Sequence, residues 1–138
     1  MIRCASLALA VILVAVPAPA QEPLSGNWSG LGLEVSGNSE TQIYPIDVRL
    51  DASGGGAIDY PDLGCGGSLT PLRTVGGVRE FRETLSYGID NCVDGGTVGL
   101  FPKDDRLIFY WTGEGTAQPD SVVSAVLRAV ASKTRMRR

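Results

Sequence analysis

After its first twenty positions, the chain is dominated by short runs in which apolar and polar residues alternate. The clearest run spans residues 43–50, where every second residue from Tyr44 to Leu50 is apolar and the residues between them are mostly polar. Alternation with a period of two places all the apolar side chains on one face of a pleated strand. The pattern therefore predicts a half-buried β-strand.

Similar runs follow at hairpin spacing, separated by turns that are rich in glycine, proline and aspartate. The chain has 18 glycines and 8 prolines, and this punctuation is typical of an antiparallel β domain. The other predicted strands are residues 27–35, a short strand ending at Tyr60, and residues 67–73, 78–87, 97–101 and 106–112. In the first of these, Leu31, Leu33 and Val35 share one face.

Residues 121–130 fit two patterns. Val123, Val126, Leu127 and Val130 form a helical stripe, whereas alternate residues from Val123 also suit a strand. We favour a strand, because it completes a set of eight and allows the sheet to close without exposed edges. The fold prediction is all-β: a small antiparallel meander of about eight strands in a closed or nearly closed barrel, with one disulfide and no second domain.

The first twenty residues predict export. Arg3 precedes the apolar run 7–16, and Ala18-Pro19-Ala20 resembles a signal-peptide cleavage site. The run is too short for a membrane span of about 20 residues. We therefore expect a signal peptide at 1–20, a barrel-like domain at 21–130, a secreted or periplasmic location, and no transmembrane segment after cleavage.

Cleavage would remove Cys4 and leave Cys65 and Cys92 as an even pair in an oxidising compartment. The chain has no histidine, which excludes Ser-His-Asp and Cys-His catalysis and histidine-ligated zinc. We accordingly predict no enzymatic activity, no cofactor and no metal.

Charge is distributed unevenly along the chain. Against 15 acidic residues there are 12 basic ones, four of which lie in the predicted basic tail at 131–138. An acidic body argues against nucleic-acid binding, which needs a basic face. The tail is predicted to be either a solvated terminus or a weak contact for anionic surfaces.

Gly26-Asn27-Trp28 resembles the Gly-x-Trp motif that begins calycin barrels such as lipocalins. In that family the tryptophan plugs one end of the barrel and an arginine near the C-terminus packs across it. The resemblance implies that Trp28 and Arg128 have these roles here.

A broader resemblance extends from Trp28 to Arg128. Tyr60-Pro61 is followed by Cys65-Gly66-Gly67-Ser68-Leu69, and later by Cys92. This order is similar to a little-characterised extracytoplasmic bacterial domain with a Tyr-Pro-x-x-Cys-Gly-Gly-x-Leu signature, from which this chain departs by one more residue between Pro61 and Cys65. That domain also forms the outer module of some bacterial Ser/Thr kinases. The resemblance implies an envelope setting and supports pairing of the two cysteines, but it implies no activity.

Glu83 is the most unusual single residue, because it shares a strand face with Phe81 and Leu85. An inward carboxylate would need a partner. We expect an ion pair with Arg79 or Arg128 as the main possibility, and ligand recognition inside the barrel as the alternative. Tyr110, on the face opposite to its core neighbours, is predicted to be an exposed contact residue.

These features favour a non-enzymatic binding or interaction domain of the bacterial envelope, whose partner is an unidentified protein or envelope ligand. Trp28, Glu83, Tyr110 and Arg128 are the candidate contact residues. Two alternatives stay open: a calycin-like carrier of a small apolar ligand, and a secreted protease inhibitor acting through a rigid loop.

Overall fold

The computed structural model describes residues 14–17 and 24–131, and these residues form eight strands and no helix. The strands are β1 (Gly26–Val35), β2 (Thr41–Leu50), β3 (Gly56–Tyr60), β4 (Cys65–Val75), β5 (Val78–Tyr87), β6 (Thr97–Lys103), β7 (Arg106–Thr112) and β8 (Val122–Val130). The all-β prediction is confirmed. The predicted cleavage point after Ala20 and the charged residues of the predicted tail lie outside the described residues.

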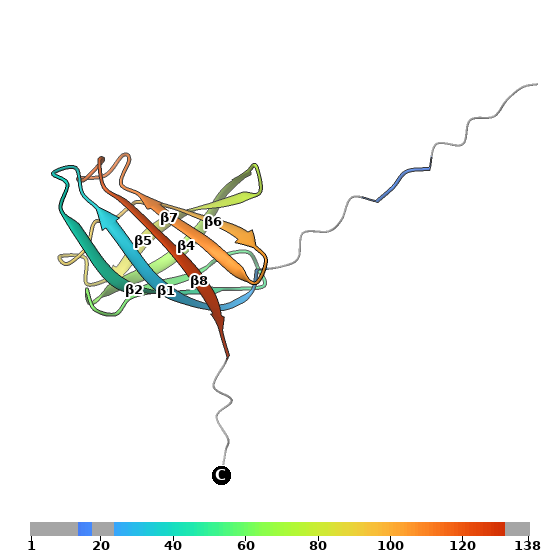
Figure 1. Ribbon diagram of the computed structural model, residues 1–138, viewed down its shortest axis with the longest axis horizontal. Helices are drawn as coiled ribbons and strands as arrows, with labels where there is room; N and C mark the ends of the chain where they lie inside the picture. The colour runs from blue at the N-terminus through green and yellow to red at the C-terminus, as the bar shows by residue number, and fades with distance from the viewer. Residues whose placement is uncertain (1–13, 18–23, 132–138) are drawn as a thin grey trace, which may run out of the picture.

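Every strand pairs antiparallel with the next one, and β8 pairs back with β1, so that the sheet closes into a barrel (Figure 1). Residues 122–130 are therefore a strand, as favoured from the sequence, because the pairing along β1 and β7 satisfies both of its edges. No helix that could span a membrane occurs among the described residues.

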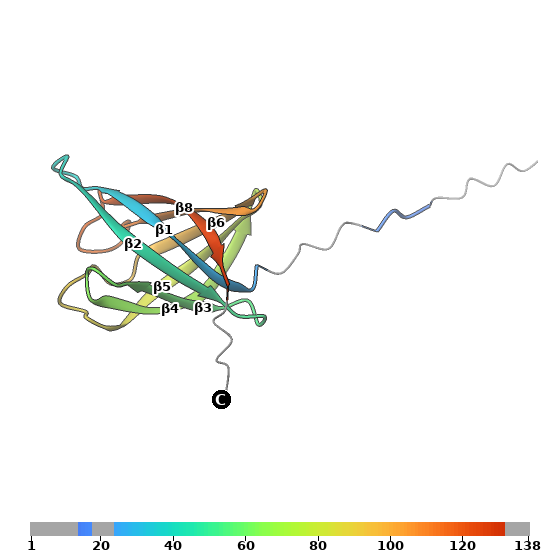
Figure 2. The ribbon, with the colours of Figure 1, turned by 60° about the horizontal axis from the view of Figure 1, so that its bottom comes forward.

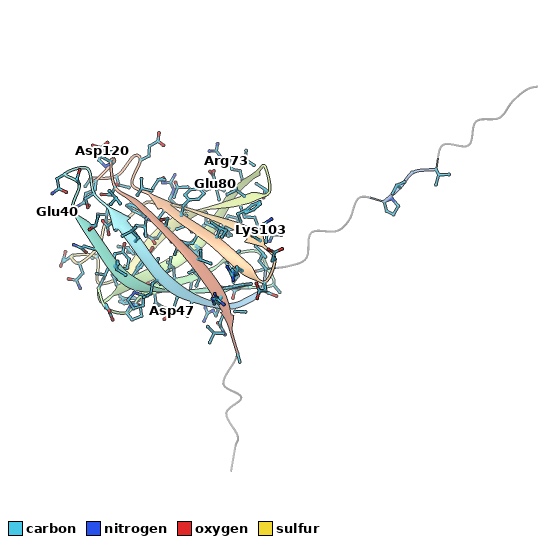
Figure 3. All side chains as sticks on the ribbon, viewed as in Figure 1. Glu40, Asp47, Arg73, Glu80, Lys103 and Asp120 are labelled. Carbon is cyan, nitrogen blue, oxygen red and sulfur yellow. A yellow bond between two sulfur atoms is a disulfide. The ribbon has the colours of Figure 1, made fainter. Side chains whose placement is uncertain are left out.

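The two ends of the barrel differ. The connections at 36–40, 61–64, 88–96 and 113–121 all lie at one end, which we call the mouth. The short turns at 51–55, 76–77 and 104–105 lie at the other end, where β1 also begins and β8 ends (Figure 2). Glu40 and Asp120 lie at the mouth and Lys103 at the opposite end (Figure 3).

The interior is packed with apolar side chains through its middle and toward the end opposite to the mouth. Fully buried residues there include Ile46, Ile58, Leu100, Phe109 and Leu127. An eight-stranded barrel is just wide enough for its own side chains to fill it or to enclose one small ligand. Here the packed core occupies only part of the length.

The apolar face of β1 is the outer one. Leu31 is 65% exposed and Leu33 is 43% exposed, whereas Gly30 and Gly32 face inward. A Cβ atom at Gly32 would lie 3.1 Å from the side chain of Val123 and closer still to that of Ile46. Glycine is needed at this position because neighbouring strands already fill the interior beside it.

A disulfide joins Cys65, the first residue of β4, to Cys92 in the connection between β5 and β6, with a Cα–Cα distance of 6.3 Å. The predicted pairing is confirmed. Because the bond links the first residue of β4 to the 88–96 connection at the mouth, it holds that segment against the barrel wall.

We predict that replacing both cysteines by serine lowers the free energy of unfolding by about 3–4 kcal/mol, because the closed loop spans 27 residues. Urea unfolding of Cys65→Ser/Cys92→Ser against the oxidised parent measures the loss. Reduced parent protein is the control and should match the double variant. A loss below about 1 kcal/mol would contradict this account of the disulfide.

Candidate functional site

A cavity of about 370 Å³ opens at the mouth of the barrel. Its floor and walls are inward side chains of β1, β2, β3, β5, β7 and β8, and its rim is formed by all four mouth connections. The alternation of each strand directs these side chains inward above the packed core. This volume is within the range of small-molecule sites in proteins.

Glu83 lies at the floor of this cavity with only 2% of its surface exposed. The Tyr60 hydroxyl donates a hydrogen bond to Oε2 at 2.6 Å, and the Trp111 indole Nε1–H donates to Oε1 at 3.2 Å. The carboxylate is therefore held by one donor on each oxygen, and both donors are uncharged. The expected ion pair with Arg128 is wrong, because Arg128 is exposed on the outside of the barrel.

The Trp111 ring reaches Glu83 because Gly96 lies against it. A Cβ atom at Gly96 would overlap the indole, and the Gly96 carbonyl accepts a hydrogen bond from the Glu83 backbone N–H at 3.0 Å. The same connection is anchored at Asp94, whose carboxylate accepts a hydrogen bond from the Leu85 N–H at 2.8 Å. The 88–96 segment thus positions both the carboxylate and its donor.

A second tyrosine–carboxylate pair lies higher on the cavity wall. The Tyr44 hydroxyl donates to Glu34 Oε2 at 2.7 Å. The rings of Tyr44 and Tyr60 meet edge to face with their centroids 5.9 Å apart, a favourable aromatic geometry. The ring contact joins the two pairs into one interior network that runs from Glu34 to Trp111.

Burial governs the protonation of this network. Burial raises the pKa of Glu83, and the nearby negative charge of Asp94 acts in the same direction, whereas the hydrogen bonds from Tyr60 and Trp111 oppose the shift. The pKa of Tyr60 lies well above its ordinary value because of burial and the adjacent Glu83. Burial and the bond to Glu34 likewise raise the pKa of Tyr44. Both tyrosines therefore act as hydroxyl donors at any ordinary pH.

The lining of the cavity is negatively charged. Glu34, Glu40, Glu83 and Asp90 contribute carboxyl groups, and no lysine or arginine is among the described residues that line it. Sequence reasoning singled out Glu83 but missed Glu34, Tyr44, Tyr60 and Trp111 as its companions. The alternation in β2 predicted that Tyr44 lies on the apolar face of its strand, but not that it joins a network with Glu83 through the Tyr60 ring.

Trp28 and Arg128 are not brought together. In the register of β1 and β8, Trp28 lies opposite Ala129 whereas Arg128 lies opposite Ser29, so their side chains project from opposite faces of the sheet. Trp28 is half-buried near the end away from the mouth, and its indole N–H donates to the Leu24 carbonyl at 3.2 Å. The stack implied by the calycin resemblance is therefore not formed.

Tyr110 lies on the outer face, as predicted, but it is half-buried. Its ring crosses Gly99, and its hydroxyl donates to Glu80 Oε1 at 2.8 Å. Glu80 also forms an ion pair with Arg73 at 2.5 Å. Tyr110 thus takes part in a polar network across β4, β5, β6 and β7.

A metal site is not apparent in the described part of the chain, which contains no group of three or more acidic or cysteine side chains arranged to hold an ion. The oxygens of Glu83 instead face hydrogen-bond donors and aromatic rings. The site therefore suits a ligand that donates hydrogen bonds to carboxylates and packs against aromatic rings.

We predict that the free energy of unfolding of Glu83→Gln, compared with that of the parent at the same pH, increases as the pH rises. Because burial raises the folded-state pKa of Glu83, the folded state binds this proton more tightly than the unfolded state, whose glutamate pKa is about 4.3. The contribution of Glu83 to the parent's free energy of unfolding is thus complete below about pH 4, and it is lost as the pH rises through the pKa of Glu83 in the folded state.

Urea unfolding of both proteins between about pH 4 and pH 8 tests this, with Asp105→Asn as a control that removes a charge from the exposed turn between β6 and β7. The glutamine keeps a hydrogen bond to each neighbour, since its oxygen accepts from the Trp111 indole and its amide donates to the oxygen of the Tyr60 hydroxyl, whose own hydrogen rotates away. A difference between Glu83→Gln and parent that does not change with pH would show that Glu83 titrates normally.

No protein-family model, curated protein or solved structure matches this chain. The resemblances described from the sequence therefore remain predictions.

Proposed function

We propose that the protein is a secreted or periplasmic, non-enzymatic binding protein that holds a small ligand in the mouth of its barrel. The observation that carries the proposal is the cavity of about 370 Å³, in which a buried carboxylate, a second carboxylate and three aromatic rings converge. A concave site with a few convergent polar groups is the usual form of a small-molecule site.

The rigidity of the mouth supports binding by a preformed site. The disulfide ties Cys92 to the wall at Cys65, and the Asn91 side chain donates to the Gly64 carbonyl at 3.4 Å. The Arg82 guanidinium also donates to the Gly95 carbonyl at 2.6 Å. A site ordered before binding loses less entropy when its ligand enters.

The disulfide also supports export, because such bonds persist in oxidising compartments and are rare in the cytosol. Strand β1 begins and strand β8 ends at the end opposite to the mouth, so neither strand crosses the opening (Figure 1). This arrangement suits a protein that collects a ligand from the envelope or the medium.

Among the alternatives, a carrier for an apolar ligand fits the mouth less well, since four carboxyl groups line it. Carboxylate-based catalysis is disfavoured because the carboxylates of Glu34 and Glu83 are each held by a tyrosine. Protease inhibition through the 88–96 loop stays a prediction; residues 90–93 of this loop line the cavity, whereas Ile89 is exposed.

We predict that Gln42→Trp abolishes ligand binding, because Gln42 lines the cavity at the rim and an indole there would occupy the opening. Thr41→Trp is the matched control, since Thr41 is the preceding residue of β2 and projects from the opposite face. Ligand-detected NMR with a library of soluble cationic, neutral and anionic fragments measures binding.

Fragments should bind the parent and Thr41→Trp but not Gln42→Trp. The proposal fails if no fragment of any charge binds the parent, or if binding survives in Gln42→Trp.

A further inference from the structure

We infer that the mouth selects a small organic cation, an amine or a guanidine compound with an apolar body. This inference rests on the proposed function and specifies its ligand class. The sequence pointed to Glu83 as a possible recognition group without indicating the charge of what it recognises.

The first argument is the balance of charge in the cavity. Four carboxyl groups line it, and the described lining has no basic residue. The neighbouring charge that acts on Glu83 is another carboxylate, that of Asp94. A buried carboxylate is costly unless it is neutralised, and a ligand cation would neutralise it where the protein supplies only uncharged donors.

The second argument is the hydrogen-bonding capacity of the two carboxylates. Glu83 accepts one bond on each oxygen, from Tyr60 and Trp111, although a carboxylate has about four acceptor positions. Glu34 accepts from Tyr44 and, at 3.5 Å, from the Ser36 hydroxyl. Acceptor positions therefore remain unused, and an ammonium group with three N–H donors or a guanidinium with five can fill them.

The third argument is the aromatic lining. Tyr44, Tyr60 and Trp111 present rings to the cavity beside the carboxylates. The face of an aromatic ring attracts a cation, and tryptophan does so most strongly. The same rings offer contact area to the apolar body of a ligand.

The volume favours an organic cation over a metal ion. A cavity of about 370 Å³ is far larger than a single ion requires. The described residues also contain no group of three or more acidic or cysteine side chains arranged to coordinate one. An anion is disfavoured by repulsion from all four carboxylates.

Three probes of matched shape separate these possibilities: benzylammonium, benzyl alcohol and benzoate. Titration of ¹⁵N-labelled protein, followed by the shifts of backbone amides around the mouth, gives the dissociation constants. We expect benzylammonium to bind at least about tenfold more tightly than benzyl alcohol, and benzoate not to bind, because a charged hydrogen bond in a desolvated site exceeds a neutral one by that margin.

Glu34→Gln and Glu83→Gln should each weaken benzylammonium binding by about tenfold and leave benzyl alcohol binding unchanged. Asp105→Asn makes the same change in net charge at the opposite end and should bind benzylammonium like the parent. If Glu83→Gln does not fold, Glu34→Gln still decides the test, because Glu34 is less buried.

The outcomes distinguish the two proposals. If benzyl alcohol or benzoate binds as tightly as benzylammonium, the mouth is a binding site but does not select a cation. If Asp105→Asn weakens benzylammonium binding as much as the mouth variants do, the affinity depends only on the net charge of the protein, and the inference is wrong. If none of the probes and no library fragment binds, the proposed function fails as well.

Discussion

Pairing of β8 with β1 is the constraint from which the other features follow. Closure satisfies the backbone hydrogen bonds of both edge strands and fixes the diameter of the interior for eight strands. Within that diameter the apolar side chains from β2 to β8 fill the middle of the barrel. The mouth lies beyond the packed core, and the inward residues there are mainly polar or aromatic. The cavity is thus the part of a closed barrel that its own side chains leave unfilled.

The buried carboxylate shows how the barrel tolerates a polar group in such a place. Glu83 comes from β5, Tyr60 from β3 and Trp111 from β7, three strands that are not neighbours. Only a closed barrel brings them together, because inward side chains from opposite walls meet across the interior. Both donors are neutral, so the network satisfies the hydrogen bonds of the carboxylate without cancelling its charge. That uncancelled charge distinguishes the mouth from an ordinary polar core.

Several glycines face inward or lie under aromatic rings, and they decide where larger side chains go. Gly32 leaves room for Ile46, Gly96 for the indole of Trp111, and Gly99 for the ring of Tyr110. In the sequence these residues resemble turn punctuation or weak strand positions. Their effect is tertiary, since the atoms that a Cβ would meet come from other strands. Gly30 and Gly32 together also explain why the apolar side chains of β1 point outward.

The alternation of apolar and polar residues and the turn residues determined the all-β class and the strands up to residue 112, and the two cysteines left after the predicted cleavage indicated the disulfide. These are local or compositional properties, so they can be read without knowing which strands are neighbours. Residues 121–130 also fit a helical stripe, and closure decided that they are a strand. Which face of β1 is inward, why Tyr87 points outward although it alternates along β5 with Glu83, and which groups hold Glu83 were decided only by the tertiary structure. A register shift near Gly66 and Gly67 turns Tyr87 outward to Asp59, and the partners of Glu83 come from strands on other walls. Contacts of this kind depend on closure and register, which bring together residues that no spacing along the chain relates.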